Sequence, residues 1–195
     1  MNQEKQPICW ILAGVNGAGK TTFALKYLPN VVNCTAFVNA DLIAAGLSPL
    51  APEKEILQAS RLFLGEIANY EKVRCNFSFE TTLSGRSYLQ IIRRLQKSGW
   101  RVELIYLALP SAEMSKMRVL ERVEHGGHNI PTAAIERRFP RSLHNLLTDF
   151  SYLVDKTHCF MNDSESPELI FVQEGQHREI INQTLFNHLL QKAGL

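Results

Sequence analysis

The sequence predicts an α/β protein in which a mostly parallel sheet is covered by helices on both faces. Three observations carry this prediction: short apolar runs alternate with amphipathic stretches, a glycine-rich turn follows the first run, and the chemically reactive residues follow the ends of runs. Strands that alternate with helices form βαβ units and hence a parallel sheet. Because such sheets bind ligands beyond the carboxyl ends of their strands, the alternation also predicts where the site lies.

In the first half of the chain, we expect strands at 7–13, 35–39 and 74–79, with helices at 21–28 and from 52 to about 70. The run 7–13 is almost continuously apolar, as is typical of a strand buried on both faces. Pro29 is expected to end the first helix, because an inner helical turn needs the N–H that proline lacks. Pro52, followed by two glutamates, is a favourable start for the second helix.

The second half should continue the alternation. We expect a helix at 85–97, a strand at 102–108, weaker strands at 158–161 and 169–172, and a closing helix from about 178 to 192. Ser111 is the expected N-cap of a further helix. Residues 116–141 carry six basic side chains against three acids, around a Gly126-Gly127 hinge, which indicates a small mobile lid.

Composition places the chain among soluble, cytoplasmic proteins of one domain, residues 1–195. A net charge of +2, with 45% hydrophobic and 21% charged residues, gives no general attraction to nucleic acid or membrane. The apolar run near the N-terminus is too short for a spanning helix and lacks the flanks of a signal peptide. The four cysteines form no CxxC pair, which favours buried reduced thiols and a reducing compartment.

The segment GVNGAGKT, residues 14–21, fits the phosphate-loop pattern GxxxxGK[ST] and lies between an expected strand and an expected helix. Its glycines let backbone N–H groups point at phosphate oxygens, and the helix N-terminus adds partial positive charge. Lys20 would contact the β- and γ-phosphates of ATP, and Thr21 would be a ligand of Mg²⁺. The expected nucleotide-binding residues are Gly14, Asn16, Gly17, Ala18, Gly19, Lys20, Thr21 and Thr22.

Two motifs that the sequence lacks narrow the class of phosphate-loop protein. The sequence contains no Asn-Lys-x-Asp element for guanine, and no apolar run ending in the paired acids of motor-type ATPases. A small kinase therefore fits best, with a central sheet, an acceptor pocket and an arginine-bearing lid.

Two acids follow expected strands. Asp41 can take the proton of an attacking hydroxyl, although an aspartate here could instead cap the short helical turn after it. Glu80 ends a buried strand and should bind the acceptor, a metal-bound water or an arginine, unless it forms a structural salt bridge. Thr81, Thr82 and Arg86 follow it as candidate acceptor-binding residues.

The basic residues of the lid are candidates for binding the transferred phosphoryl group. Arg118 and Arg122 lie one helical turn apart, and Arg138 and Arg141 share another face. We expect Arg122 and Arg138 to act in catalysis and Arg118 and Arg141 to bind nucleotide. His128 is a candidate hydrogen-bonding residue that locks the lid.

These motifs together resemble one family. The phosphate loop, Asn39-Ala40-Asp41, Phe79-Glu80-Thr81-Thr82-Leu83-Ser84 and the arginine-bearing segment with Gly126-Gly127-His128-x-Ile130-Pro131 are similar to the zeta-toxin-like family of small P-loop kinases, in its bacterial chromosomal branch. The resemblance covers about residues 8 to 175. It implies a three-layer P-loop NTPase fold of nucleoside-kinase type, with strand order 2-3-1-4-5.

The resemblance also implies roles. The acid matching Asp41 is the base for the acceptor hydroxyl, the acid matching Glu80 helps hold the acceptor, and lid arginines bind the phosphates of ATP. The implied acceptor is the 3′-hydroxyl of UDP-N-acetylglucosamine, and the implied partner is an antitoxin-type protein. The function predicted from the sequence is therefore transfer of a phosphoryl group from ATP to a small-molecule hydroxyl. A regulatory ATPase without a small acceptor is the alternative, and a polynucleotide kinase is a weaker one.

Overall fold

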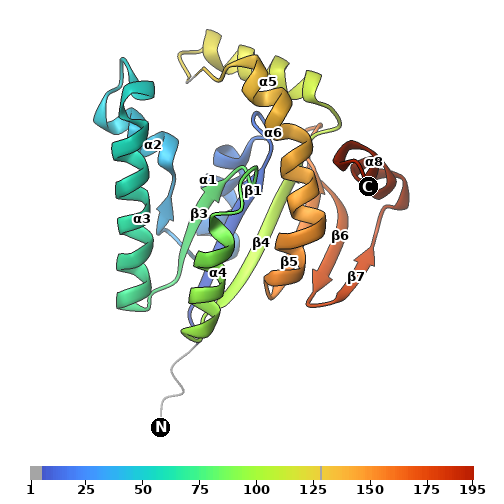
Figure 1. Ribbon diagram of the computed structural model, residues 1–195, viewed down its shortest axis with the longest axis horizontal. Helices are drawn as coiled ribbons and strands as arrows, with labels where there is room; N and C mark the ends of the chain where they lie inside the picture. The colour runs from blue at the N-terminus through green and yellow to red at the C-terminus, as the bar shows by residue number, and fades with distance from the viewer. Residues whose placement is uncertain (1–5, 128) are drawn as a thin grey trace.

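The computed structural model describes residues 6–127 and 129–195 (Figure 1). Across these residues seven strands form one sheet in the order β2-β3-β1-β4-β5-β6-β7. The pairings among β1 to β5 are parallel and have the expected order 2-3-1-4-5, whereas β6 and β7 extend the sheet antiparallel. The strands are β1 Ile8–Gly14, β2 Phe37–Val38, β3 Phe77–Thr81, β4 Arg101–Ala108, β5 Lys156–Met161, β6 Glu168–Glu174 and β7 His177–Ile180.

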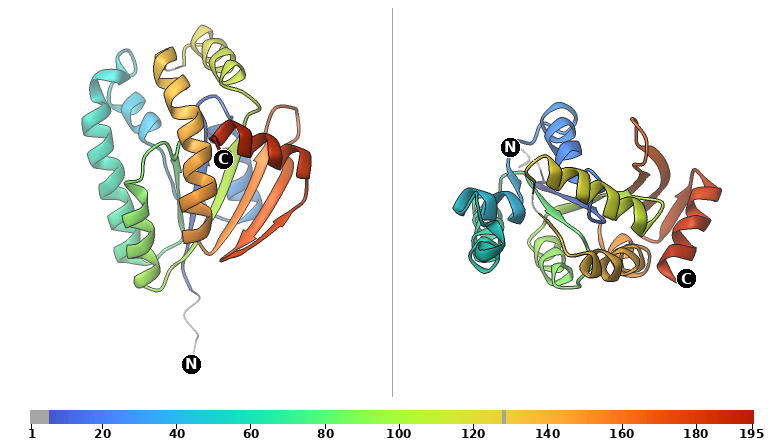
Figure 2. Two further views of the ribbon diagram at one scale, coloured as in Figure 1. Left: turned by 45° about the vertical axis from the view of Figure 1, so that its right-hand side comes forward. Right: turned by 90° about the horizontal axis from the view of Figure 1, so that it is seen from above.

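Helices cover both faces of the sheet, as the sequence predicts (Figure 2). Alternate residues of a strand point to opposite faces, so Trp10 and Leu12 of β1 pack against α1 while Cys9 and Ile11 belong to the larger core under α3, α4 and α6. The helices are α1 Lys20–Val31, α2 Ala40–Leu47, η1 Pro52–Glu55, α3 Ile56–Val73, α4 Tyr88–Lys97, α5 Ala112–Glu124, α6 Thr132–Asn145, η2 Leu146–Phe150, α7 Ser151–Leu153 and α8 Gln183–Ala193.

Several predicted boundaries are wrong. Helix α1 continues through Pro29 to Val31, because proline so near the end removes a single hydrogen bond to Leu25, a residue that is 63% exposed to water. Strand β2 is only two residues long, since Asn39 leaves the strand to cap α2. Strand β3 begins at Phe77, because Arg74 adopts left-handed backbone, with φ of 54°, at the end of α3.

The C-terminal prediction also fails in part. Residues 177–180, expected at the start of a helix, form strand β7, and α8 begins only at Gln183 with the Asn182 side chain as its cap. The turn between β6 and β7 contains Gly175 at a φ of 56°, a conformation that glycine adopts without strain. Helical spacing of apolar residues cannot separate this short edge strand from the helix after it.

The cysteines are all free, and three of them are buried as expected, but Cys75 is exposed. It lies in the loop after α3, where the chain has not yet entered the sheet. Among the described residues, no helix has both the length and the apolar character that crossing a bilayer requires.

Candidate active site

The glycine-rich segment forms a tight loop between β1 and α1. Gly17 and Gly19 have φ of 73° and 76°, the left-handed region that favours glycine. Gly19 precedes α1 and has no side chain to cap it, so the first N–H groups of the helix can bind an anion. Lys20 is buried beneath the loop, and its Nζ donates a hydrogen bond to the Val15 carbonyl at 3.1 Å.

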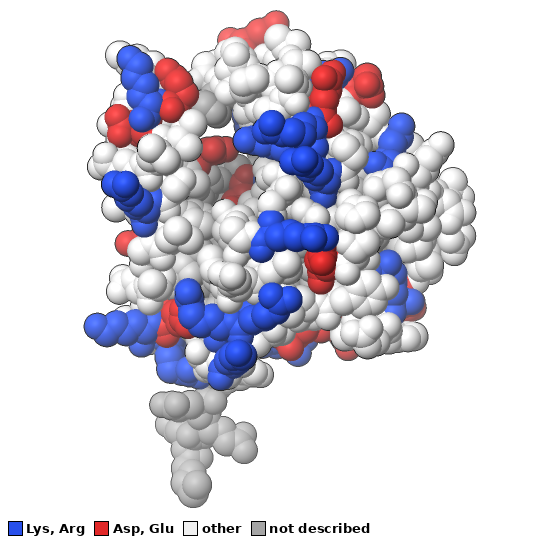
Figure 3. Space-filling model, viewed as in Figure 1, with Lys and Arg blue, Asp and Glu red and all other residues white. Residues whose placement is uncertain are grey.

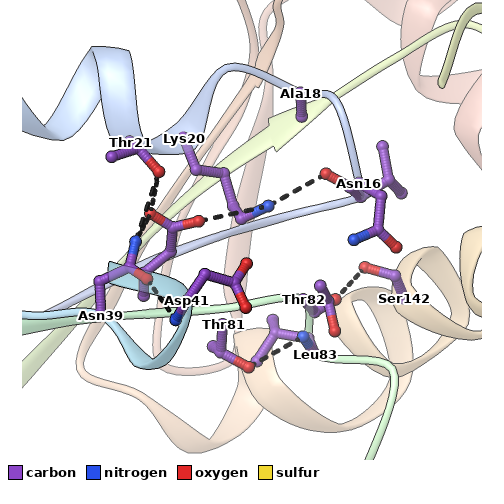
Figure 4. Close-up of polar contacts among 12 residues, drawn as sticks. Asn16, Ala18, Lys20, Thr21, Asn39, Asp41, Thr81, Thr82, Leu83 and Ser142 are labelled. Atoms are coloured by element: carbon purple, nitrogen blue, oxygen red, sulfur yellow. Dashed lines mark hydrogen bonds and ion pairs between the residues drawn. The ribbon is translucent and has the colours of Figure 1, made fainter. Parts of the chain in front are cut away.

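Glu80 connects the loop to the neighbouring strand. β3 pairs with β1 so that Glu80 lies opposite Leu12, next to the phosphate loop. The Thr21 hydroxyl and the Asn39 amide each donate to Glu80 Oε2 at 2.7 Å, and Lys20 Nζ lies 3.6 Å from Oε1. The side chains of Lys20 and Asn39 project toward the Glu80 carboxylate (Figure 4). The positive charge and two donors offset the cost of burying the carboxylate.

Asn39 belongs to a motif of the family resemblance but was not among the predicted site residues. Its Oδ1 accepts from the backbone N–H groups of Asp41 and Leu42 at 2.8 and 3.1 Å, so Asn39 is the N-cap of α2. The alternative in which Asp41 is the cap is therefore wrong. Because the cap is supplied by Asn39, the exposed carboxylate of Asp41 projects into the space between Lys20 and Thr82 (Figure 4). An asparagine directly before a short apolar helix is the signal that could have found this role.

Two cavities meet at this point. The first, of about 280 Å³, is lined by Asp41, Thr82, Ser84 and Tyr88, and the second, of about 430 Å³, by the phosphate loop and the α5 residues Arg118, Glu121 and Arg122. Figure 3 shows the hollow, with acidic side chains inside it and basic side chains at its rim. Both cavities are lined by Gly17, Lys20, Glu80 and Arg122.

The wall of the first cavity is rich in hydroxyl groups. The Thr82 and Ser84 hydroxyls lie 2.9 Å apart, and the Thr81 hydroxyl accepts from the Leu83 N–H at 3.2 Å, which stabilises the turn in which Leu83 has a φ of 53°. Burial raises the pKa of Tyr88, and the nearby Asp41 charge adds to the increase, whereas a hydrogen bond from Thr81 opposes it. Tyr88 therefore stays protonated and can donate a hydrogen bond into the cavity.

The family model described as zeta toxin matches residues 58–170, more than half of the chain. This chain belongs to the zeta toxin family. The match begins beyond the phosphate loop and Asp41, so the family assignment and the loop motif are independent observations. The resemblance to zeta-toxin-like P-loop kinases is thus confirmed.

The chain is also similar to several solved structures and to a curated relative. A chain from a crystal structure of AvrRxo1-ORF1 with AvrRxo1-ORF2 and sulphate ions superposes with a TM-score of 0.74 at 18% identity, covering 95% of this chain and 64% of that one. A chain of the PezAT toxin–antitoxin system of Streptococcus pneumoniae gives 0.68 at 17% identity, covering 96% of this chain and 78% of that one. An uncharacterized Haemophilus influenzae protein is 29% identical over 126 residues, 65% of this chain and 88% of its own length. At these identities the structural matches show the P-loop kinase fold.

In this zeta toxin family member, the predicted site residues divide into two groups. The predicted residues that line the two cavities are those of the phosphate loop, Asp41, Glu80, Thr82, Arg118 and Arg122. The exceptions in the loop are Gly14, which ends β1, and Ala18, which is buried. Thr81 lines the first cavity but its hydroxyl is engaged in the turn. Glu80 contacts the phosphate loop and lines both cavities.

Three predicted arginines are not brought to either cavity. Arg86 instead forms an ion pair with Asp149 at 2.8 Å, because η2 places that carboxylate beside it. Arg138 and Arg141 lie on α6, and neither is among the residues that line the cavities. His128 lies outside the described residues. Two residues that contact the phosphate loop, Ser115 and Asn162, were missed because each is a single polar residue with no motif around it.

Proposed function

We propose that this zeta toxin family member is a kinase that transfers the γ-phosphoryl group of ATP to a hydroxyl of a small molecule in the cytoplasm. The observation that carries the proposal is the junction of the two cavities at Lys20, Glu80 and Arg122. A phosphate-binding loop opens on one side of this junction and a carboxylate, Asp41, on the other. A donor phosphate and an acceptor hydroxyl would meet there in line.

Each residue has a role that its position supports. The loop N–H groups and Lys20 bind the β- and γ-phosphates, and Arg122, which reaches both cavities, stabilises charge on the transferred group. Asp41 accepts the proton of the acceptor hydroxyl. Arg118 binds nucleotide from the second cavity, and closure of the proposed lid, residues 116–141, would bring Arg138 and Arg141 nearer.

The side-chain oxygen atoms of Thr21 and Glu80 lie 2.7 Å apart, and oxygen atoms are the ligands that Mg²⁺ prefers, so these residues fit a magnesium ion. When bound, Mg²⁺ neutralises phosphate charge. Glu80 then orients the Thr21 hydroxyl and balances the charge of Lys20.

The acceptor cavity fits a polyhydroxy compound. Its hydroxyl groups from Thr82, Ser84, Ser87 and Tyr88 can exchange hydrogen bonds with sugar hydroxyls. UDP-N-acetylglucosamine is the acceptor that the family resemblance suggests. An antitoxin-type partner is proposed on the same ground, and the toxin–antitoxin complex among the structural relatives supports it. The structural relative AvrRxo1-ORF1:-ORF2 was also crystallised with ATP.

ADP release by the purified protein with ATP and Mg²⁺, measured with and without UDP-N-acetylglucosamine, tests this proposal. We expect a large stimulation by the sugar nucleotide, with Lys20→Ala as the blank. Slow ADP release at the same rate with and without the sugar nucleotide would mean that the ATP site serves another acceptor. It would also favour the regulatory ATPase. Absence of any release above the blank would contradict the kinase proposal.

Replacing Glu80 by glutamine tests its link to Mg²⁺. Glutamine keeps the size of the side chain and one acceptor oxygen, but it removes the charge near Lys20 and Thr21. We expect the gain in ATP affinity on adding Mg²⁺ to shrink about tenfold, because charged groups form the stronger interactions with a metal ion. Calorimetric titration with ATP, in Mg²⁺ and in EDTA, measures it. An unchanged gain would contradict this role of Glu80.

Replacing Arg122 by alanine should lower kcat about a hundredfold, since one donor to developing charge contributes on that order. Arg86→Ala is the matched control, because Arg86 is exposed, pairs with Asp149 and lies outside both cavities. Its kcat should stay near that of the wild type. Equal kcat values for the two variants would contradict the role of Arg122.

A further inference from the structure

Helix α5 contacts the phosphate loop through a buried serine. Ser115 is fully buried, and its hydroxyl donates to the Asn16 carbonyl at 2.5 Å. The C=O and N–H of one trans peptide point in opposite directions. A carbonyl held toward α5 therefore directs the Gly17 N–H away from the helix and into the loop.

Asn162, the residue after β5, holds the peptide between Ala18 and Gly19 in the same way. The Asn162 side-chain amide donates to the Ala18 carbonyl at 2.8 Å, so the Gly19 N–H is directed to the opposite side. Asn162 is itself fixed, because its backbone N–H donates to the Ala108 carbonyl at the end of β4 at 3.0 Å. Both supports lie outside the loop that they hold.

The two contacts are tight enough to require glycine in the loop. A Cβ on Gly17 would lie 2.9 Å from the Ser115 carbonyl oxygen, and a Cβ on Gly19 would lie 3.0 Å from Asn162 Nδ2. A side chain on Gly17 would therefore clash with backbone of α5, and one on Gly19 would press on the Asn162 amide. The supports and the glycines are thus parts of one arrangement.

Ser115 and Asn162 also fix the part of α5 that carries the arginines. Ser115, Arg118 and Arg122 share one face of α5, and the Arg118 guanidinium donates to the Asn162 carbonyl oxygen at 2.6 Å. The first half of α5 is thus fastened to the loop through Ser115 and to the residue after β5 through Arg118, and Arg118 and Arg122 both line the second cavity.

We infer that Ser115 and Asn162 are positioning residues, which hold the phosphate loop in its anion-binding conformation by binding its carbonyls from outside. The inference rests on the proposed nucleotide site, to which it adds two residues. Neither side chain needs to touch the nucleotide. Their effect is to orient the N–H groups of Gly17 and Gly19 in advance, so that binding does not have to order them.

The test compares Ser115→Ala and Asn162→Ala with the wild type. Each substitution removes one hydrogen-bond donor to a loop carbonyl and adds no charge near the phosphate loop. Ser151→Ala is the matched control, because Ser151 is also fully buried with one side-chain hydrogen bond, to Arg178 at 2.9 Å, but lies on α7. Titration calorimetry gives the Kd of Mg·ATP, kinetics gives the KM of each substrate, and thermal melting reports folding.

We expect both positioning variants to raise the Kd and KM of ATP about tenfold, the effect of one oriented hydrogen bond, with the KM of the acceptor unchanged. Ser151→Ala should leave both ATP constants unchanged. Folded variants that bind ATP as the wild type does, or an equal loss in Ser151→Ala, would overturn the inference. If Asn162→Ala does not fold, Ser115→Ala alone decides the test. A wild type that binds no ATP would instead overturn the proposed nucleotide site and this inference with it.

Discussion

Lys20→Ala is expected to reduce phosphoryl transfer by more than about a thousandfold, because it removes the one buried cation at the junction of the two described cavities. The Lys20 ammonium lies 3.6 Å from Glu80 and is anchored by the Val15 carbonyl, so it is already in place for a phosphate. Initial rates of ADP release, at saturating ATP and acceptor, measure the effect.

Loss of folding must be separated from loss of chemistry in this variant. Without Lys20, the Glu80 carboxylate keeps two neutral donors but loses its ion pair, and breaking a buried pair costs about 3 kcal/mol of unfolding free energy. Circular dichroism below the melting temperature and a melting curve show whether the variant is folded. A folded Lys20→Ala protein that retains even a tenth of the wild-type rate would show that Lys20 does not stabilise the transferred group.

The sequence predicts the strand, loop and helix around residues 14–21 well, because this segment is local in the chain. A contiguous motif fixes the order of strand, loop and helix, and its glycines have the positive φ that the loop requires. The alternation of segments likewise predicts a mostly parallel sheet, whereas the strand order 2-3-1-4-5 is implied by the family resemblance. These features need no knowledge of which residues distant in the sequence come together.

Predictions for single residues fail where the contacts of the residue depend on a partner that is distant in the sequence. Arg86 satisfies the chemistry of a substrate-binding residue, but Asp149 is sixty-three positions away and pairs with it. Ser115 and Asn162 are separated from the loop carbonyls that they bind by 99 and 144 positions. Strand β7 was missed because an edge strand that buries little has hardly any apolar pattern.

Asp41→Asn should lower kcat about a thousandfold while leaving ATP affinity nearly unchanged, within the range that general base catalysis contributes. The reason is the division of the site: Asp41 lines only the first cavity, whereas Thr21 and Arg118 line only the second. Asparagine has the size of aspartate but cannot accept a proton at neutral pH. The kcat of the variant and its Kd for Mg·ATP, measured separately, test both halves of the prediction.

The fold should tolerate this substitution. Helix α2 is capped by Asn39, and Asp41 contributes only its charge in the first turn, about 0.5 kcal/mol of favourable interaction with the helix dipole. Asn39→Ala provides the contrast, because it removes the cap and a donor to Glu80 together, so it should lower the melting temperature where Asp41→Asn does not. If Asp41→Asn kept kcat within a few-fold of the wild type, Asp41 would not be the base. Glu80, the other acid at the junction, already accepts hydrogen bonds from Thr21 and Asn39 on Oε2 and lies beside Lys20, so its carboxylate is engaged within the protein, whereas the Asp41 carboxylate is exposed.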